Sequence, residues 1–464
     1  MQNIDIQEIP YQPNSDALFQ AVRDLPDAIW LDSGKPGSTQ GRFDIISACP
    51  DALIETRGAA STITDSSGIT TSDRDPFELA EQLLQPLLPL DSAASNYPFV
   101  GGLIGYFGYD LGRRLIDIDD RATAVTNLPD MRIGRFLWAL IVDHSARQCQ
   151  LLFHNNCPAQ LRADILQRFT EKSLPAPSKS LFTLGGKFTA TLDQNQYQQA
   201  IQHIKSYIAA GDCYQTNFAQ HFSARFKGDL WTAYKGLREK LPSPYSAFWQ
   251  WPDQALLCLS PERFIQSVDG AVETKPIKGT VKRGATVAED RQLSQQLINS
   301  SKDRAENLMI VDLLRNDLSK NCESGSIAVP KLFELESFAN VHHLVSTVTG
   351  KLEENSTPLS LLRDSFPGGS ITGAPKKRAM EIIEELEPVR RSAYCGSIGY
   401  ISANNRMDSN IAIRTVIADG DQLHCWGGGG IVADSQEQRE YQESIDKISA
   451  LLSALETFIP DSSC

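Results

Sequence analysis

Glu-Thr-Lys-Pro-Ile-Lys-Gly-Thr, residues 273–280, is the stretch of this chain around which its other motifs are best ordered. It predicts a strand that runs into a turn, because Pro276 cannot donate to a central ladder and Gly279 frees the backbone. Lys278 lies between an apolar residue and a glycine, so its amine points either into a cleft or, more simply, into the solvent around a basic loop. A lysine amine that is desolvated or close to another cation has a lowered pKa and becomes a nucleophile.

The composition is that of a globular protein with a real core. The 464 residues suffice for two or three average domains or for one large α/β body, and 41% of them are apolar. The formal net charge of −13 argues against nucleic acid as a partner. It also requires that an anionic substrate be attracted locally, by a few cations, helix N-termini or a metal.

The nine cysteines are scattered along the chain, and no Cys-x-x-Cys pair occurs among them. This pattern favours a reducing compartment over a disulfide framework or a zinc site. The first residues lack the basic and apolar regions of a secretory signal, and no apolar run reaches membrane-spanning length. We therefore expect a cytoplasmic protein without a membrane partner.

Periodicity predicts a β-rich first portion and a second portion in which strands alternate with helices. Four short apolar runs predict strands, the last two as a hairpin: residues 28–34, 42–48, 136–142 and 150–153. Residues 172–184 carry Pro, Ser and Lys without periodicity and are the best linker candidate. An amphipathic helix is expected at 193–210. The expected fold is a mixed α/β (α+β) body, divided into residues 1–175 and 185–457.

Two predicted helices display carboxylates on one side. Residues 301–314 form a helix by pattern, with serines at its start. The carboxylates, three residues apart on each helix, are Asp303 and Glu306 on the first and Glu440 and Glu443 on the second, where Lys447 follows. Together they would clamp a hard divalent ion, Mg²⁺ with retained waters. The alternative is a pair of solvated faces with ion pairs one turn apart.

Three glycine-rich runs are candidates for anion binding. Residues 366–376 lead into a predicted helix, whose free N–H groups suit a carboxylate or phosphate. Residues 426–432 contain four successive glycines, whose entropy cost favours an anion-binding nest over core packing. Residues 101–110 lack the order of a Walker loop and are expected to serve close backbone packing. Arg414, in an expected strand at 410–416, faces either a buried acid or an anionic ligand.

Several ordered motifs between residues 190 and 455 resemble the chorismate-utilising enzymes. They are Ser260–Phe264, Pro276–Thr280, Asp303–Asp317, His343–Ser346, Pro367–Met380, Arg414 and Glu443–Lys447. The family includes the large subunits of anthranilate synthase and aminodeoxychorismate synthase, with isochorismate and salicylate synthases as relatives. The resemblance implies a large β-sandwich-like core of two sheets with helices packed outside. It also implies an N-terminal portion like that of anthranilate synthase component I and a chorismate-binding catalytic portion.

Lys278 is the residue that discriminates within this family. Aminodeoxychorismate synthases carry Lys there, whereas anthranilate synthases usually carry Ala. The resemblance therefore implies Mg²⁺-dependent amination of chorismate at C4, a step toward p-aminobenzoate and folate. Lys278 would attack C2, Glu262 would protonate the departing C4 hydroxyl, and ammonia would then release Lys278. The alternatives are an anthranilate synthase large subunit and a non-catalytic, tryptophan-binding regulatory subunit.

The resemblance also implies a metal site and a substrate site. Glu306 and Glu443 would bind Mg²⁺, with Asp303 and Glu440 acting through water. Chorismate would be held by Thr280, His343, Ser370, Tyr394, Arg414, Gly427, Gly428, Gly429, Gly430 and Lys447. Gln215 stands near the position at which isochorismate-type relatives carry a lysine base, which argues against water as the nucleophile.

Two further ligands are expected from the resemblance. Ammonia would come from a separate glutamine amidotransferase subunit, because no Gly-x-Cys-x-Gly nucleophile turn surrounds any cysteine of this chain. A tryptophan-like ligand would contact Leu31, Ser33, Phe43, Pro244 and Tyr245. Gln40 and Gly41 depart from that pocket in the family.

Overall fold

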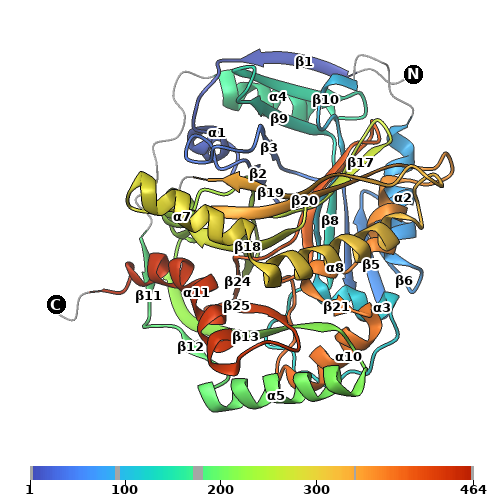
Figure 1. The fold of residues 1–464 in the computed structure, drawn as a ribbon. Helices are drawn as coiled ribbons and strands as arrows, with labels where there is room; N and C mark the ends of the chain where they lie inside the picture. The colour runs from blue at the N-terminus through green and yellow to red at the C-terminus, as the bar shows by residue number, and fades with distance from the viewer. Residues whose placement is uncertain (1–3, 89–94, 171–180, 339–340, 461–464) are drawn as a thin grey trace.

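Two large antiparallel sheets, with helices around them, form the molecule (Figure 1). The computed structural model describes residues 4–88, 95–170, 181–338 and 341–460. Most of the linker expected at 172–184 lies outside these residues. In the described part of the chain, no helix is both long and apolar enough to span a membrane.

The first sheet has 13 strands and takes them from both portions of the chain. In spatial order they are β1 (Ile4–Ile9), β10 (Gln148–His154), β9 (Trp138–Asp143), β3 (Phe43–Ser47), β2 (Ile29–Asp32), β14 (Tyr245–Trp251), β15 (Gln254–Ser260), β24 (Thr415–Asp419), β25 (Gln422–Ile431), β13 (Gln215–Gly228) and β11 (Phe182–Leu184). Two short strands also pair with β13, namely β12 (Thr189–Ala190) and β21 (Gly373–Ala374).

The second sheet has 12 strands and is mixed in the same way. In spatial order they are β18 (Ile277–Lys282), β20 (Val341–Lys351), β17 (Ala271–Thr274), β16 (Arg263–Val268), β23 (Met407–Asn410), β22 (Ser397–Ser402), β7 (Gly102–Phe107), β8 (Met131–Phe136), β4 (Ala52–Arg57), β5 (Ala60–Asp65) and β6 (Gly68–Ser72). The remaining strand, β19 (Ala328–Ser337), pairs with β20.

Helices cover the sheets from outside. They are α1 (Asp16–Gln20), α2 (Pro76–Leu84), α3 (Gly112–Leu115), α4 (Ala159–Thr170), α5 (Gln194–Ala210), α6 (Leu230–Lys240), α7 (Val287–Ile298), α8 (Ser301–Leu318), α9 (Pro358–Ser365), α10 (Lys376–Leu386) and α11 (Glu437–Glu456). Short 3₁₀ turns include η1 (Gln85–Leu87), η3 (Tyr109–Leu111) and η4 (Gly369–Ile371). Helices α7 and α8 pack against β18 and β20, and α11 packs against β25 (Figure 1).

Local sequence signals account for the elements that were easiest to predict. The expected hairpin forms as β9 and β10, which pair antiparallel. Helix α5 begins with a capping box, in which the Asp193 side chain accepts from the Gln196 N–H, and ends at Gly211 with a φ of 86°. Ser300 caps α8 by accepting from the Asp303 N–H. The four expected strands and both of these helices are confirmed.

The two sheets face each other and share one core. The rings of Tyr106 on β7 and Trp249 on β14 lie 6.2 Å apart between centroids, edge to face. The Arg132 guanidinium on β8 lies 4.8 Å from the ring of Trp251 on β14. Because each sheet combines strands from both portions of the chain, the largest apolar cluster is common to the two portions.

The glycine-dense run at 101–110 forms β7 in the middle of the second sheet, followed by η3. A Cβ added to Gly105 would collide with the backbone oxygen of Arg132 on the neighbouring strand. The glycines therefore allow close approach of backbones, as the sequence favours, and they form no phosphate loop.

Candidate active site

A bulge in β18 positions the lysine of the 273–280 stretch. The chain does not remain in a turn after Pro276 as expected, but resumes as β18, which pairs with β20. The pairing register shifts between Ile277 and Thr280, so Lys278 and Gly279 form the irregular step. Such an extra residue bends a strand and re-aims its side chains. Gly279 has a φ of 85°, a backbone conformation that favours glycine.

Ser370 connects the two expected catalytic residues. Lys278 Nζ donates to the Ser370 carbonyl at 3.2 Å, and Ser370 Oγ donates to Glu262 Oε1 at 3.0 Å. Glu262 lies between β15 and β16 and is buried, while Lys278 is partly buried. Ser370 itself lies in η4, the turn before α10. Two segments close in sequence, at Glu262 and Lys278, thus meet the distant η4 turn.

Burial favours the uncharged form of both expected catalytic groups. It raises the pKa of the Glu262 carboxyl to about 7, although Lys278 and the Ser370 hydrogen bond oppose this shift. Burial also lowers the pKa of the Lys278 amine, against the pull of Glu306 and Glu262. A protonated carboxyl beside a neutral amine is the state that general-acid and nucleophilic catalysis require.

The four successive glycines form part of a strand and not a nest, so the expected nest geometry is wrong, while binding of the substrate by these residues stays a prediction. Residues 427–430 belong to β25 and pair with β13, and no positive φ occurs among them. A Cβ on Gly428 would collide with the Phe218 carbonyl, and one on Gly427 with the Ser444 carbonyl. These two glycines therefore serve close packing against β13 and α11. From their entropy cost, the sequence alone favours anion binding over such packing.

The next glycine keeps space open for charged side chains. A Cβ on Gly429 would lie 3.1 Å from Lys447 Nζ and 3.3 Å from Glu443 Oε1, both on α11. Lys447 donates to the Gly428 carbonyl at 3.0 Å and pairs with Glu443 at 2.7 Å. The Lys447 ammonium is the main reason why the pKa of Glu443 is lowered.

The expected magnesium ligands come together from α8 and α11. Glu306 Oε1 is buried and has no hydrogen-bond partner among the described residues. Glu440 is also buried and accepts from Ser435 Oγ at 2.7 Å. Burial raises the pKa of Glu306, and the Glu443 charge adds to that rise. A carboxylate oxygen without a hydrogen bond, next to a second carboxylate, fits a divalent cation.

The carboxylates do not form a dense cage. Within the described residues, no three acidic, histidine or cysteine side chains are grouped closely enough to enclose a metal ion. That is compatible with Mg²⁺, which keeps several waters and takes one or two protein carboxylates together with the substrate. Asp303 and Glu440 would then act through water, as the sequence suggests.

Arg414 lies in a bend between β23 and β24, so the strand expected at 410–416 is wrong at this point. Its φ of 51° is left-handed, and a non-glycine residue there stores roughly 1–3 kcal/mol of strain. Burial lowers the pKa of its guanidinium, and no carboxylate in the described ranges forms an ion pair with it. A buried cation without a counter-charge suits a carboxylate of the substrate.

His343 and Thr280 lie beside this cation. Thr280 Oγ1 and His343 Nδ1 are 2.7 Å apart across the β18–β20 pair. Burial lowers the pKa of His343 to about 4, and the Arg414 charge contributes to the lowering. His343 is therefore neutral at physiological pH and binds through hydrogen bonds rather than through charge.

The sequence interpretation missed the contacts of two residues of the site, Trp426 and Lys302, and did not place a third, Gln215. Trp426 stacks on Tyr394 with centroids 5.9 Å apart and an interplanar angle of 12°. Lys302 contacts Glu306 and Glu440, a role that only its spacing of four from Glu306 hints at. Gln215, noted as a replacement for a lysine, lies against Gly430, and neither amide atom has a partner in the described residues.

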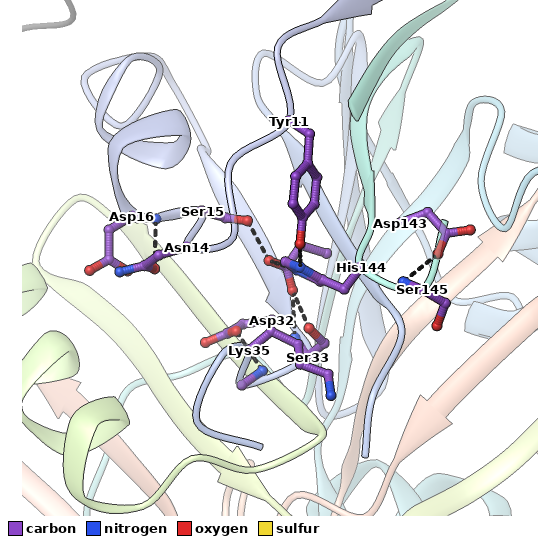
Figure 2. A network of polar contacts seen from close by, with 12 residues as sticks. Tyr11, Asn14, Ser15, Asp16, Asp32, Ser33, Lys35, Asp143, His144 and Ser145 are labelled. Carbon is purple, nitrogen blue, oxygen red and sulfur yellow. Dashed lines mark hydrogen bonds and ion pairs between the residues drawn. The ribbon is translucent and has the colours of Figure 1, made fainter. Parts of the chain in front are cut away.

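The residues expected to hold a tryptophan-like ligand come from neighbouring strands of the first sheet. Leu31 lies on β2, Phe43 on β3, Ser33 just after β2, and Pro244 and Tyr245 at the start of β14. The Ser33 amide and hydroxyl both donate to Asp44 at 2.7 Å, and Ser15 and His144 contact the same buried carboxylate (Figure 2). These partners orient Ser33 and leave its hydroxyl oxygen able to accept a hydrogen bond.

Comparison with known proteins identifies the family of the chain. The sequence matches the family model described as chorismate binding enzyme over residues 27–453. It is 46% identical to aminodeoxychorismate synthase component 1 of Klebsiella aerogenes, over 97% of this chain and 98% of that protein. It is 33% identical to anthranilate synthase component 1 of Aquifex aeolicus, over 92% and 89%. The crystal structure of anthranilate synthase component I from Streptococcus pneumoniae TIGR4 has 31% identity and a TM-score of 0.79, covering 89% of this chain and 93% of that one.

Proposed function

The chain belongs to the chorismate-binding enzyme family, and we propose that it converts chorismate to 4-amino-4-deoxychorismate, as the large subunit of an aminodeoxychorismate synthase. The observation that carries the proposal is the joint contact of Lys278 and Glu262 with Ser370. Burial raises the pKa of Glu262 and lowers the pKa of Lys278, and both shifts favour the uncharged form of the group. The product would supply p-aminobenzoate and thus folate synthesis.

The first step forms a covalent bond to the enzyme. The neutral Lys278 amine uses its lone pair to bond C2 of chorismate, the ring double bonds shift, and the C4–O bond breaks. Glu262 supplies the proton with which the C4 hydroxyl leaves as water. A carboxyl with a pKa of about 7 still holds this proton in roughly half of the molecules at neutral pH.

The second step installs nitrogen and regenerates the enzyme. Ammonia bonds to C4, the electrons return through the ring, and the bond between C2 and Lys278 breaks. The proton that the new ammonium group loses restores Glu262. We infer that a separate glutamine amidotransferase subunit supplies the ammonia. The absence of a glutaminase motif from this sequence supports that inference.

Cations of the site would hold the substrate's two carboxylates. In the sequence, Arg414 precedes the Gly427–Gly430 segment and Lys447 follows it. Both offer positive charge within a protein of net charge −13. Thr280, His343, Ser370 and Tyr394 would contact the ring and its substituents. Mg²⁺, held by Glu306 and Glu443, would neutralise a substrate carboxylate when bound.

Product analysis tests the proposal. The purified chain would be incubated with chorismate, MgCl₂ and ammonium chloride at mildly alkaline pH, and the products separated and weighed by mass spectrometry. The expected product keeps the enolpyruvyl group and carries an amine in place of the C4 hydroxyl. Fluorescent anthranilate with free pyruvate would instead assign the chain to the anthranilate branch. Absence of turnover with retained tryptophan binding would favour the regulatory alternative.

We also propose that Leu31, Ser33, Phe43, Pro244 and Tyr245 hold a tryptophan-like ligand. The support is their position on or beside three neighbouring strands and the fixed orientation of Ser33. Native mass spectrometry of the purified protein, followed by titration of L-tryptophan, measures this directly. A protein that neither retains nor binds tryptophan overturns this assignment without affecting the active site.

A cytoplasmic location completes the proposal. Every cysteine in the described ranges is a free thiol, which fits a reducing compartment. Fractionation of the source cells, with the protein detected by antibody, would check this location.

A further inference from the structure

An ammonium group lies between the carboxylates of the expected metal site. Lys302, in the first turn of α8, places Nζ 3.3 Å from Glu440 Oε1 on α11 and 3.8 Å from Glu306 Oε1 one turn further along α8. Its side chain is 48% exposed, whereas those of Glu306 and Glu440 are 14% and 4% exposed. The lysine therefore reaches inward from the surface to one buried acid, Glu440, and one partly buried acid, Glu306.

We propose that Lys302 is a resident counter-cation that competes with Mg²⁺ for these carboxylates. The inference rests on the proposed function, which places Mg²⁺ at Glu306 and Glu443. In this arrangement, Lys302 bridges α8 and α11 in the metal-free enzyme and withdraws when the ion binds. It thereby weakens the affinity of the enzyme for Mg²⁺.

The charge pattern of the site supports the first part of this proposal. Buried charges persist in proteins only when they are paired. Glu443 has its own partner, because Lys447 lies 2.7 Å from it. For Glu306 and Glu440, Lys302 is the one cation that forms an ion pair within the described residues. Without it, Glu440 would have no ion-pair partner in the described ranges, and Glu306 would keep only the charge of Lys278, which acts on it without forming an ion pair.

The geometry supports the competition. Mg²⁺ binds oxygen at about 2.0–2.1 Å and demands a nearly octahedral shell. An ammonium 3.8 Å from Glu306 Oε1 occupies the space into which that shell extends, and it repels the incoming ion. Lysine can withdraw readily, because its charge sits on a flexible four-carbon stem and half of its side chain is already exposed.

Calorimetric titration of MgCl₂ into metal-free protein tests the proposal. Lys302→Met keeps the length of the side chain and removes its charge, so we expect Mg²⁺ to bind about tenfold more tightly than to wild type. Lys302→Arg keeps the charge and should bind Mg²⁺ no more tightly than wild type does. Melting temperatures give a second readout. In the chelator EDTA, Lys302→Met should melt at a lower temperature than wild type. Added Mg²⁺ should raise the melting temperature of Lys302→Met by more than it raises that of wild type.

Lys320→Met is the matched control. Lys320 lies just beyond the other end of α8, is also 48% exposed, and pairs with Asp317 at 3.6 Å away from the site. Its loss should leave Mg²⁺ affinity unchanged. Equal or weaker Mg²⁺ binding by Lys302→Met overturns the inference while the metal site stands. Absence of Mg²⁺ binding to wild type overturns both the metal site and this inference. If Lys302→Met fails to fold, Lys302→Gln replaces it in the same Mg²⁺ titration and melting measurements.

Discussion

The Ser370 hydroxyl donates a 3.0 Å hydrogen bond to Glu262, and the backbone carbonyl of the same serine accepts from Lys278. One residue of the 366–376 loop therefore touches both the proposed acid and the proposed nucleophile. Arg391 stabilises this loop by donating a hydrogen bond to the Ile371 carbonyl at 2.8 Å. The relative positions of the two reactive groups depend on how this loop is supported.

Glu262 should titrate near pH 7 in the free enzyme, because burial raises its pKa. Ser370→Ala should raise that pKa further, since the serine hydrogen bond favours the ionised carboxylate. Infrared difference spectroscopy measures the protonated carboxyl directly, and Glu262→Gln assigns the band. Titration near the ordinary value of 4.5 would contradict the buried environment of Glu262.

The same shift sets a direction for stability. Between about pH 4.5 and pH 7, the folded protein keeps the Glu262 proton that the unfolded chain has already lost. The unfolded state then binds fewer protons, so the free energy of unfolding falls as pH rises through this window. Glu262→Gln should lack this contribution and gain stability relative to wild type from pH 5 to pH 8. Urea midpoints at several pH values measure the difference.

Lys278→Ala should slow amination of chorismate by about 10³-fold or more, because it removes the attacking amine. Mg²⁺ and chorismate binding should change little, which calorimetry would show. Lys282→Ala, at the exposed end of the same strand, is the control and should keep normal turnover. Normal turnover in Lys278→Ala would remove this lysine from the mechanism.

Glu306→Gln should weaken Mg²⁺ binding by about 10²-fold, since a neutral amide replaces one of two direct ligands. The measurement is MgCl₂ titration followed by calorimetry. Glu437→Gln, on α11 but paired with Lys205 at 3.2 Å outside the site, should bind Mg²⁺ as wild type does. Equal losses in the two variants would point to a general charge effect rather than to ligation.

Two adjacent glycines should respond differently to alanine. Gly429→Ala meets the flexible ends of Lys447 and Glu443, so the protein should fold while its KM for chorismate rises about tenfold. Gly428→Ala meets the backbone of Phe218 and should lower the melting temperature. Gly186→Ala has no atom within 4 Å of the added Cβ and is the control. Steady-state kinetics and melting curves separate the two effects.

The buried pair of Arg391 and Glu387 should be critical for stability. They lie 2.6 Å apart, with side chains 1% and 3% exposed. Arg391→Met leaves a buried carboxylate without its partner and should cost about 3–5 kcal/mol of unfolding free energy. Denaturant unfolding measures this cost.

The matched control is Arg74→Met, at an exposed pair with Glu78, which should cost less than about 1 kcal/mol. A double variant, Arg391→Met with Glu387→Gln, should recover part of the loss. Similar costs for the buried and the exposed pair would contradict the importance of the buried one.

Much of the fold could be predicted where the signal is local. The capping box at Asp193, the left-handed Gly211 and the Ser300 cap define α5 and α8 through interactions within a few residues. The hairpin β9–β10 follows from alternation and a short turn. The sheet order could not be predicted, because strands such as β2 and β14 pair across some 200 residues of sequence and periodicity does not record the partner.

The errors have physical causes that lie outside the local pattern. The strand at 427–430 contains glycines because β13 and α11 approach Gly427 and Gly428 too closely for side chains. Arg414 lies in a left-handed bend, and no neighbouring glycine or proline in the sequence indicates that bend. Lys302 lies on a predicted helix, yet its contact with Glu440 exists only because α8 and α11 are brought together.

The sequence by itself determined the family resemblance, the residue types that carry the chemistry and the carboxylate spacing on two helices. Those properties depend on residue identity and on short separations along the chain. Only the tertiary structure decided that Ser370 joins Lys278 to Glu262, and that burial shifts the pKa of both. Desolvation and charge pairing depend on which distant segments exclude water from a group, and the packing of the sheets with their helices and turns sets that arrangement.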